Sequence, residues 1–140
     1  MSKTAVVFWS GTGNTEEMAN AVLEGMKENG ADASIYSADA FQAGDVDAYD
    51  AIAFGCPAMG AEVLEEDEFQ PLFDECKSAL EGKKVALFGS YGWGDGEWMR
   101  NWEDDCREAG IELACDSVVC NDAPDEDAIT ACKELGAALV

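Results

Sequence analysis

The sequence contains no histidine and few basic residues. It has 8 lysine and arginine residues against 30 aspartate and glutamate residues, so its formal net charge is −22. Nucleic acids and anionic membrane surfaces are therefore unsuitable partners, because both repel a strongly acidic protein. Partner proteins with basic surfaces are favoured, since the field of the chain would steer them in. The alternative is that the charge serves only to keep the protein soluble.

Long apolar runs and closely spaced cysteine pairs are also missing. No stretch is long enough to span a membrane, and the first residues lack the pattern of a signal peptide. None of the cysteines forms a C-x-x-C pair, and no histidine can complete a mixed metal site. We therefore expect a cytoplasmic protein with no metal site and with reduced, mostly buried thiols. The cysteines are Cys56, Cys76, Cys106, Cys115, Cys120 and Cys132, and Cys115 and Cys120 are expected to share a strand.

The 140 residues, of which 48% are apolar, suffice for one domain (1–140) with a substantial core. We predict strands over 3–9, 31–37, 51–56, 85–88 and 111–120, and helices over 16–27, 63–80, 97–109 and 126–140. The second strand is weakly apolar and suits a sheet edge, and Pro71 marks either a break or the true start of the second helix. Several strands are continuous apolar runs. This alternation therefore predicts an α/β fold, a parallel sheet with helices on both faces.

A glycine- and hydroxyl-rich turn joins the first strand to the first helix. Its residues are Ser10, Gly11, Thr12, Gly13, Asn14 and Thr15. Unpaired N–H groups and the positive end of the helix dipole suit a phosphate at this place. The turn lacks the lysine of an ATP-binding loop, and Glu16 stands where a dinucleotide-binding loop has its third glycine. We therefore predict a cradle for one phosphate group, the alternative being an ordinary capped turn.

Two further loops follow the third and fourth predicted strands. They contain Pro57, Ala58, Met59, Gly60, Ala61 and Glu62, and Ser90, Tyr91, Gly92, Trp93 and Gly94. All three loops should meet at the carboxyl edge of a parallel sheet, where such folds bind ligands. Met59, Tyr91 and Trp93 offer flat or polarizable surface to a ring. A phosphate at one end and a stacked ring at the other predict a mononucleotide ligand, although Met59 and Trp93 singly would also suit the edge of the core.

With these three motifs in this order, the whole chain resembles the short-chain flavodoxins. The resemblance implies a flavodoxin-like three-layer sandwich with strand order 2-1-3-4-5 and noncovalently bound FMN. It implies a low-potential one-electron carrier rather than an enzyme, which shuttles between semiquinone and hydroquinone to supply redox enzymes. The chain has no lysine or arginine in the three loops, so the negative charge of the hydroquinone formed in the second reduction is disfavoured.

The resemblance also assigns roles to single residues. Ser10, Thr12, Asn14 and Thr15 would bind the FMN phosphate, and Gly11 and Gly13 would allow its close approach. Met59 would lie on the inner face of the ring and Trp93 on the outer face, with Tyr91 and Gly92 at its edge. Glu62 would accept a hydrogen bond from N3–H, and the peptide after Met59 would flip at Gly60 so that its carbonyl accepts a hydrogen bond from N5–H. Asn121 or Asp122 would border the flavin, and Ala61 replaces a residue that is often polar in the family.

Three alternatives remain at this point. The chain could be a flavodoxin-like reductase, although it lacks a basic residue near the loops to meet a nicotinamide phosphate. It could be a receiver domain, although the first strand ends in Phe8, Trp9 and Ser10 rather than in an acid pair. It could also be a flavin protein dedicated to the activation of one enzyme. The strongly acidic surface favours a monomer.

Overall fold

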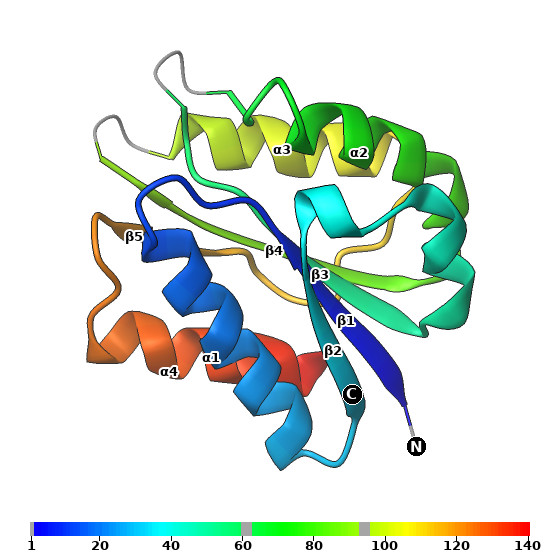
Figure 1. The fold of residues 1–140 in the computed structure, drawn as a ribbon, viewed down its shortest axis with the longest axis horizontal. Helices are drawn as coiled ribbons and strands as arrows, with labels where there is room; N and C mark the ends of the chain where they lie inside the picture. The colour runs from blue at the N-terminus through cyan, green and yellow to red at the C-terminus, as the bar shows by residue number, and fades with distance from the viewer. Residues whose placement is uncertain (1, 60–62, 93–95) are drawn as a thin grey trace.

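The computed structural model describes residues 2–59, 63–92 and 96–140. Five parallel strands form one sheet in the order β2-β1-β3-β4-β5, and helices cover both of its faces (Figure 1). The strands are β1 (Lys3–Phe8), β2 (Asp32–Ser37), β3 (Ala51–Gly55), β4 (Lys84–Tyr91) and β5 (Val118–Asn121). The helices are α1 (Asn14–Glu28), α2 (Phe69–Cys76), α3 (Glu97–Glu108) and α4 (Glu126–Ala138). The predicted α/β class, the strand order and the edge position of the second strand are confirmed. None of the helices in the described ranges is both long and apolar enough to cross a bilayer.

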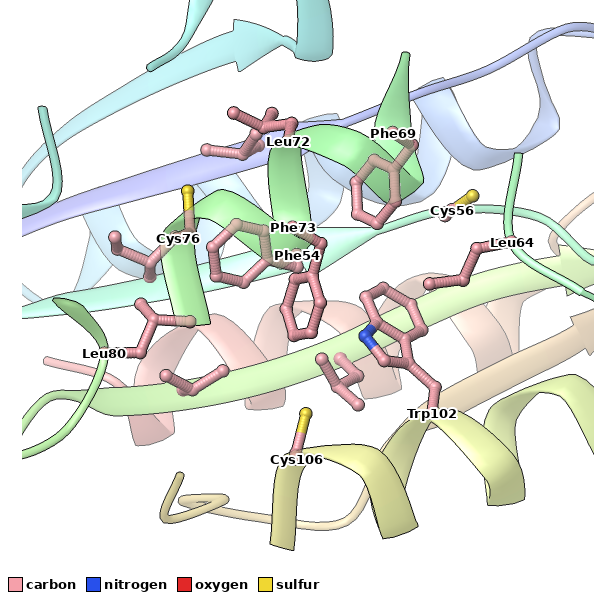
Figure 2. Packing of buried hydrophobic residues seen from close by; sticks show 14 of the residues in the cluster. Phe54, Cys56, Leu64, Phe69, Leu72, Phe73, Cys76, Leu80, Trp102 and Cys106 are labelled. Carbon is pink, nitrogen blue, oxygen red and sulfur yellow. The ribbon is translucent and has the colours of Figure 1, made fainter. Parts of the chain in front are cut away.

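Alternate residues of the central strands feed two separate cores, as expected for a sheet covered on both faces. On one face, Val6 and Ala53 pack with Met18 of α1 and Leu135 of α4. On the other face, an aromatic cluster joins β3 to α2 and α3 (Figure 2). Most ring pairs in that cluster are edge-on, as aromatic pairs prefer, whereas Phe69 and Phe73 are stacked. The edge-on pairs include Phe54 with Phe73 at 5.1 Å and Phe69 with Trp102 at 5.4 Å between ring centroids.

Two glycines allow α1 and α4 to touch. A Cβ on Gly25 would lie 2.1 Å from the carbonyl oxygen of Lys133, and one on Gly136 would lie 2.2 Å from that of Val22. Side chains at these positions would therefore push the helices apart. The close packing therefore holds the second half of α1 against α4.

The predicted helix over 63–80 is wrong in its first part, because α2 begins only at Phe69. The carboxylate of the buried Glu65 accepts hydrogen bonds from the backbone N–H groups of Asp67, Glu68 and Phe69, at 2.7–2.8 Å. These bonds satisfy donors that have no partner inside the helix. Pro71 lies in the first helical turn, where its missing N–H costs no intrahelical bond. Pro71 therefore marks the true start of the helix.

The predicted strand over 111–120 is also wrong for most of its length. Leu113 forms an isolated bridge with Val85, and regular pairing with β4 resumes only at Val118. Between these points Ser117 donates a hydrogen bond of 2.7 Å to the Glu103 carboxylate of α3, which takes the chain out of the sheet. Cys115 and Cys120 thus do not share a strand. All six cysteines are free thiols and four of them are buried.

Candidate functional site

The turn between β1 and α1 is organised by Ser10. Its hydroxyl oxygen accepts hydrogen bonds from the N–H groups of Gly13, at 3.0 Å, and Glu16, at 3.3 Å. Gly13 precedes the helix with φ at 96°, a conformation that a side chain disfavours. Thr12 and Asn14 follow the bend and line the cavity described below. Ser10 and Gly13 thus shape the turn, and Thr12 and Asn14 present polar groups.

Thr15 and Ser90 join this turn to the end of β4. Both side chains are buried, and their hydroxyl oxygens lie 3.3 Å apart. The backbone N–H of Ser90 also donates a hydrogen bond to the Thr15 hydroxyl oxygen, at 3.4 Å. Thr15 does not line the cavity, whereas Ser90 does. The Thr15 hydroxyl therefore fixes the start of α1 against β4.

The loop after β3 is held at its base by backbone and side-chain contacts. The N–H of Ala58 donates to the Ser90 carbonyl at 3.0 Å, and the N–H of Met59 donates to that of Val63 at 2.9 Å. The indole N–H of the buried Trp98 donates to the Cys56 carbonyl at 3.1 Å. A Cβ on Gly89 would meet that same carbonyl at 2.2 Å. The strand ends of β3 and β4 are thus locked together just below the predicted ring-binding loops.

The three predicted loops border one cavity of about 290 Å³. Polar groups from the turn after β1 lie on the same cavity as apolar groups from the ends of β3 and β4. The lining residues are Trp9, Gly11, Thr12, Asn14, Pro57, Ala58, Met59, Ser90, Tyr91, Gly92 and Asp122. This donor set fits FMN. A hydroxyl, an amide and the N-terminus of the 15-residue helix α1 suit a phosphate, and the apolar groups suit a flat ring.

Not every residue predicted for the site lines this cavity. Ser10, Gly13 and Thr15 lie in the turn but do not line it. Gly60, Ala61, Glu62, Trp93 and Gly94 lie outside the described residues. Asp122 lines the cavity, whereas Asn121 borders a different hollow. Asp122 adopts φ of 57°, uncommon for a residue with a side chain, and donates its N–H to the Tyr91 carbonyl at 2.8 Å. Of the two residues, the geometry therefore favours Asp122.

Trp9 is a cavity residue that the sequence reasoning did not single out. It was predicted as the last residue of the first strand, but β1 ends at Phe8. The Trp9 N–H donates to the Gly55 carbonyl at 3.0 Å, and the half-buried ring lies beside Gly11, where a Cβ would meet it at 3.1 Å. A signal was available, because an aromatic residue directly before a ligand-binding turn lies at the carboxyl end of its strand.

Comparison with known proteins agrees with this geometry. The family model described as Flavodoxin matches residues 6–136. The flavodoxin of Megasphaera elsdenii is 45% identical over 133 residues, 95% of each chain, and that of Clostridium beijerinckii is 44% identical over 131 residues, 94% of each chain. The chain belongs to the flavodoxin family. The solution structure of the two-electron-reduced flavodoxin of Megasphaera elsdenii superposes with a TM-score of 0.90 over 97% of each chain, at 43% identity.

Family membership excludes two of the three alternatives that the sequence left open. Flavodoxins bind FMN and carry electrons between redox proteins, and they are not enzymes. The chain is accordingly an FMN-binding electron carrier, as predicted, and neither a reductase nor a receiver domain.

Proposed function

We propose that FMN binds in the cavity of about 290 Å³, with its phosphate on the turn after β1 and its ring between the loops that follow β3 and β4. One observation carries this proposal: residues from all three loops, such as Thr12, Met59 and Tyr91, line the same cavity. FMN bound there supplies the one-electron redox chemistry. The protein supplies the position of the ring, its exclusion from water and its electrostatic surroundings.

Neutral groups hold the phosphate in this proposal. No lysine or arginine occurs among the described residues that line the cavity. In place of a cation, the phosphate is bound by the hydroxyl of Thr12, the amide of Asn14 and the N–H groups at the start of α1. Ser10 keeps these N–H groups in position through its bonds to the turn. Glu16 and Glu17 in the first turn of α1 oppose an anion, so hydrogen bonding outweighs their repulsion.

The same lack of positive charge makes the site a low-potential one. Asp122 lines the cavity beside Tyr91, and the chain carries a formal charge of −22. These negative charges disfavour additional negative charge at the ring. Close groups such as Asp122 have the larger effect, because salt screens the distant ones. A reduction that leaves the ring anionic therefore requires a strong donor.

The sequence motifs extend the proposal to residues outside the described ranges. Trp93 is proposed to stack on the outer face of the ring and Glu62 to accept a hydrogen bond from N3–H. The peptide between Met59 and Gly60 is proposed to present its carbonyl to N5. Ala61 and Gly94 complete the two loops, and Asp122 rather than Asn121 borders the flavin.

We further propose that the chain works as a monomeric, single-domain protein of the cytoplasm and docks on basic surfaces of its redox partners. The net charge of −22 supports this, because it repels a second copy and attracts a basic protein. The buried, free thiols support a reducing compartment.

The test is an FMN titration of the purified protein followed by anaerobic photoreduction under a visible spectrophotometer. Thr12→Ala is expected to weaken FMN binding about tenfold or more, because a hydrogen bond to a charged group contributes about 1.5–3 kcal/mol. The matched control is Thr130→Ala on the exposed surface of α4, which should bind as wild type. A spectrum that bleaches through a distinct one-electron species supports the carrier. Equal affinities for both variants would remove Thr12 from the phosphate site, and a protein without flavin bands after FMN addition would refute the proposal.

A further inference from the structure

The outer side of β5 is an open sheet edge. Only β4 pairs with β5 among the described residues. The N–H of Asp122 donates to the Tyr91 carbonyl of β4 at 2.8 Å. Since successive N–H groups of a strand point to opposite sides, those of Asn121 and Val119 point away from β4. The Val119 side chain is 42% exposed, an unusual exposure for a large apolar residue of this protein.

Two hollows lie along this edge and are lined by residues of β5, of the segment before it and of α4. They have volumes of about 480 and 400 Å³ and share Val118, Val119 and Ala131, so they form one groove. The first follows the segment where the chain leaves the sheet, at Cys115. The second reaches Tyr91, which also lines the proposed FMN cavity. The groove therefore runs from the break in the last strand to the edge of the cofactor site.

The rim of the groove is acidic. Asp116 and Glu134 line the first hollow, and Asp125 and Asp127 line the second. All four are exposed, and no lysine or arginine is among the described residues that line either hollow. A second copy of this chain would bring its own net charge of −22 to this surface and be repelled. A chain segment rich in lysine or arginine matches the rim.

We propose that the open edge of β5 receives an extended basic segment of a redox partner as a sixth strand. The backbone of the segment pairs with Val119 and Asn121, its apolar side chains lie in the groove, and its cations meet the four carboxylates. This inference rests on the proposed function, because the groove ends at Tyr91 and so brings the partner beside the flavin. The same carboxylates oppose pairing of the edge with a second copy, since charge beside an edge strand is a usual protection.

The test uses the FMN-loaded, ¹⁵N-labelled protein and a short blocked peptide in which lysine alternates with valine. A peptide of the same charge with proline in place of valine serves as the control, because each proline lacks an N–H and its fixed φ disfavours a paired strand. The alternating peptide is expected to shift the amide signals of Val119 and Asn121 most strongly and to slow their hydrogen exchange. The proline peptide is expected to cause only small shifts spread over the acidic surface.

Variants separate backbone pairing from charge. Val119→Pro removes one outward N–H and is expected to weaken binding of the alternating peptide about fivefold. Val119→Thr keeps this N–H and should bind the peptide as wild type does. The double variant Asp116→Lys/Glu134→Lys is expected to weaken binding about tenfold in low salt. Asp47→Lys/Glu81→Lys changes the net charge equally on exposed sites away from β5 and is expected to have less than half that effect.

Two results would overturn the docking proposal. One is equal binding of both peptides, and the other is an equal loss in the two charge-reversed double variants. Either would show attraction by net charge without strand addition. The visible flavin spectrum of each sample reports separately on the proposed function. Its absence would refute FMN binding without affecting the peptide result.

Discussion

Replacement of Glu65 by alanine is expected to destabilise the protein by about 3 kcal/mol. The buried carboxylate accepts three backbone hydrogen bonds at the start of α2, at 2.7–2.8 Å. Loss of a helix N-cap costs about 0.5–2 kcal/mol, and a hydrogen bond to a charged group contributes about 1.5–3 kcal/mol. Water that enters the space left by the side chain replaces part of the three hydrogen bonds, so the expected net loss of stability is about 3 kcal/mol. For a domain of this size the melting temperature should fall by about 10 °C.

The pH dependence of this effect has a definite sign. Burial raises the pKa of Glu65, but the three backbone N–H donors outweigh it and hold the pKa below its ordinary value. Because the folded-state pKa is depressed, the ionised carboxylate stabilises the fold above the unfolded-state pKa of about 4.3. This stabilisation is lost as the pH falls through the folded-state pKa. The stability difference between wild type and Glu65→Ala should therefore be full at pH 7 and shrink in acid.

Urea unfolding at a fixed, saturating FMN concentration measures the difference, at pH 7 and at several acid pH values. Glu66→Ala is the matched control, since Glu66 is exposed beside Glu65. It should change stability by less than about 0.5 kcal/mol. A loss below about 1 kcal/mol for Glu65→Ala at pH 7, or a loss that does not shrink in acid, would refute the capping role of the carboxylate.

Three further predictions concern helix packing, the cavity and charge. Gly136→Ala should cost about 2–3 kcal/mol or more in urea unfolding, because its Cβ would lie 2.2 Å from the Val22 carbonyl oxygen. Gly44→Ala, which meets no atom within 4 Å, should be nearly neutral. Trp9→Ala should weaken FMN binding about tenfold or more in a fluorescence titration, and unchanged affinity would remove Trp9 from the site. Raising the ionic strength from about 0.01 to 0.15 M should strengthen FMN binding, because salt screens the repulsion between the phosphate and the acidic chain. A weakening with salt would show that a cation holds the phosphate.

The sequence by itself determined the class of fold and the place of the site. Apolar runs such as 51–56 and helical spacing such as that of Met18, Val22 and Met26 depend on local periodicity, which survives without tertiary information. The phosphate-binding role proposed for the hydroxyl turn 10–15 follows from residue types alone. Its meeting with the loops after β3 and β4 followed from the rule that parallel strands end at the same edge.

Tertiary structure decided what depends on partners distant in sequence. The late start of α2 is the exception, because Glu65 caps it through N–H groups only two to four residues further on. Ser117, by contrast, lies outside the sheet and donates to the Glu103 carboxylate of α3. Trp9 became a cavity residue because β1 ends one position early, and Asp122 rather than Asn121 faces the cavity because strand pairing with Tyr91 fixes its direction. For Ser117, Trp9 and Asp122 a hydrogen bond to another element overrides local preference, and such bonds leave no periodic trace in the sequence.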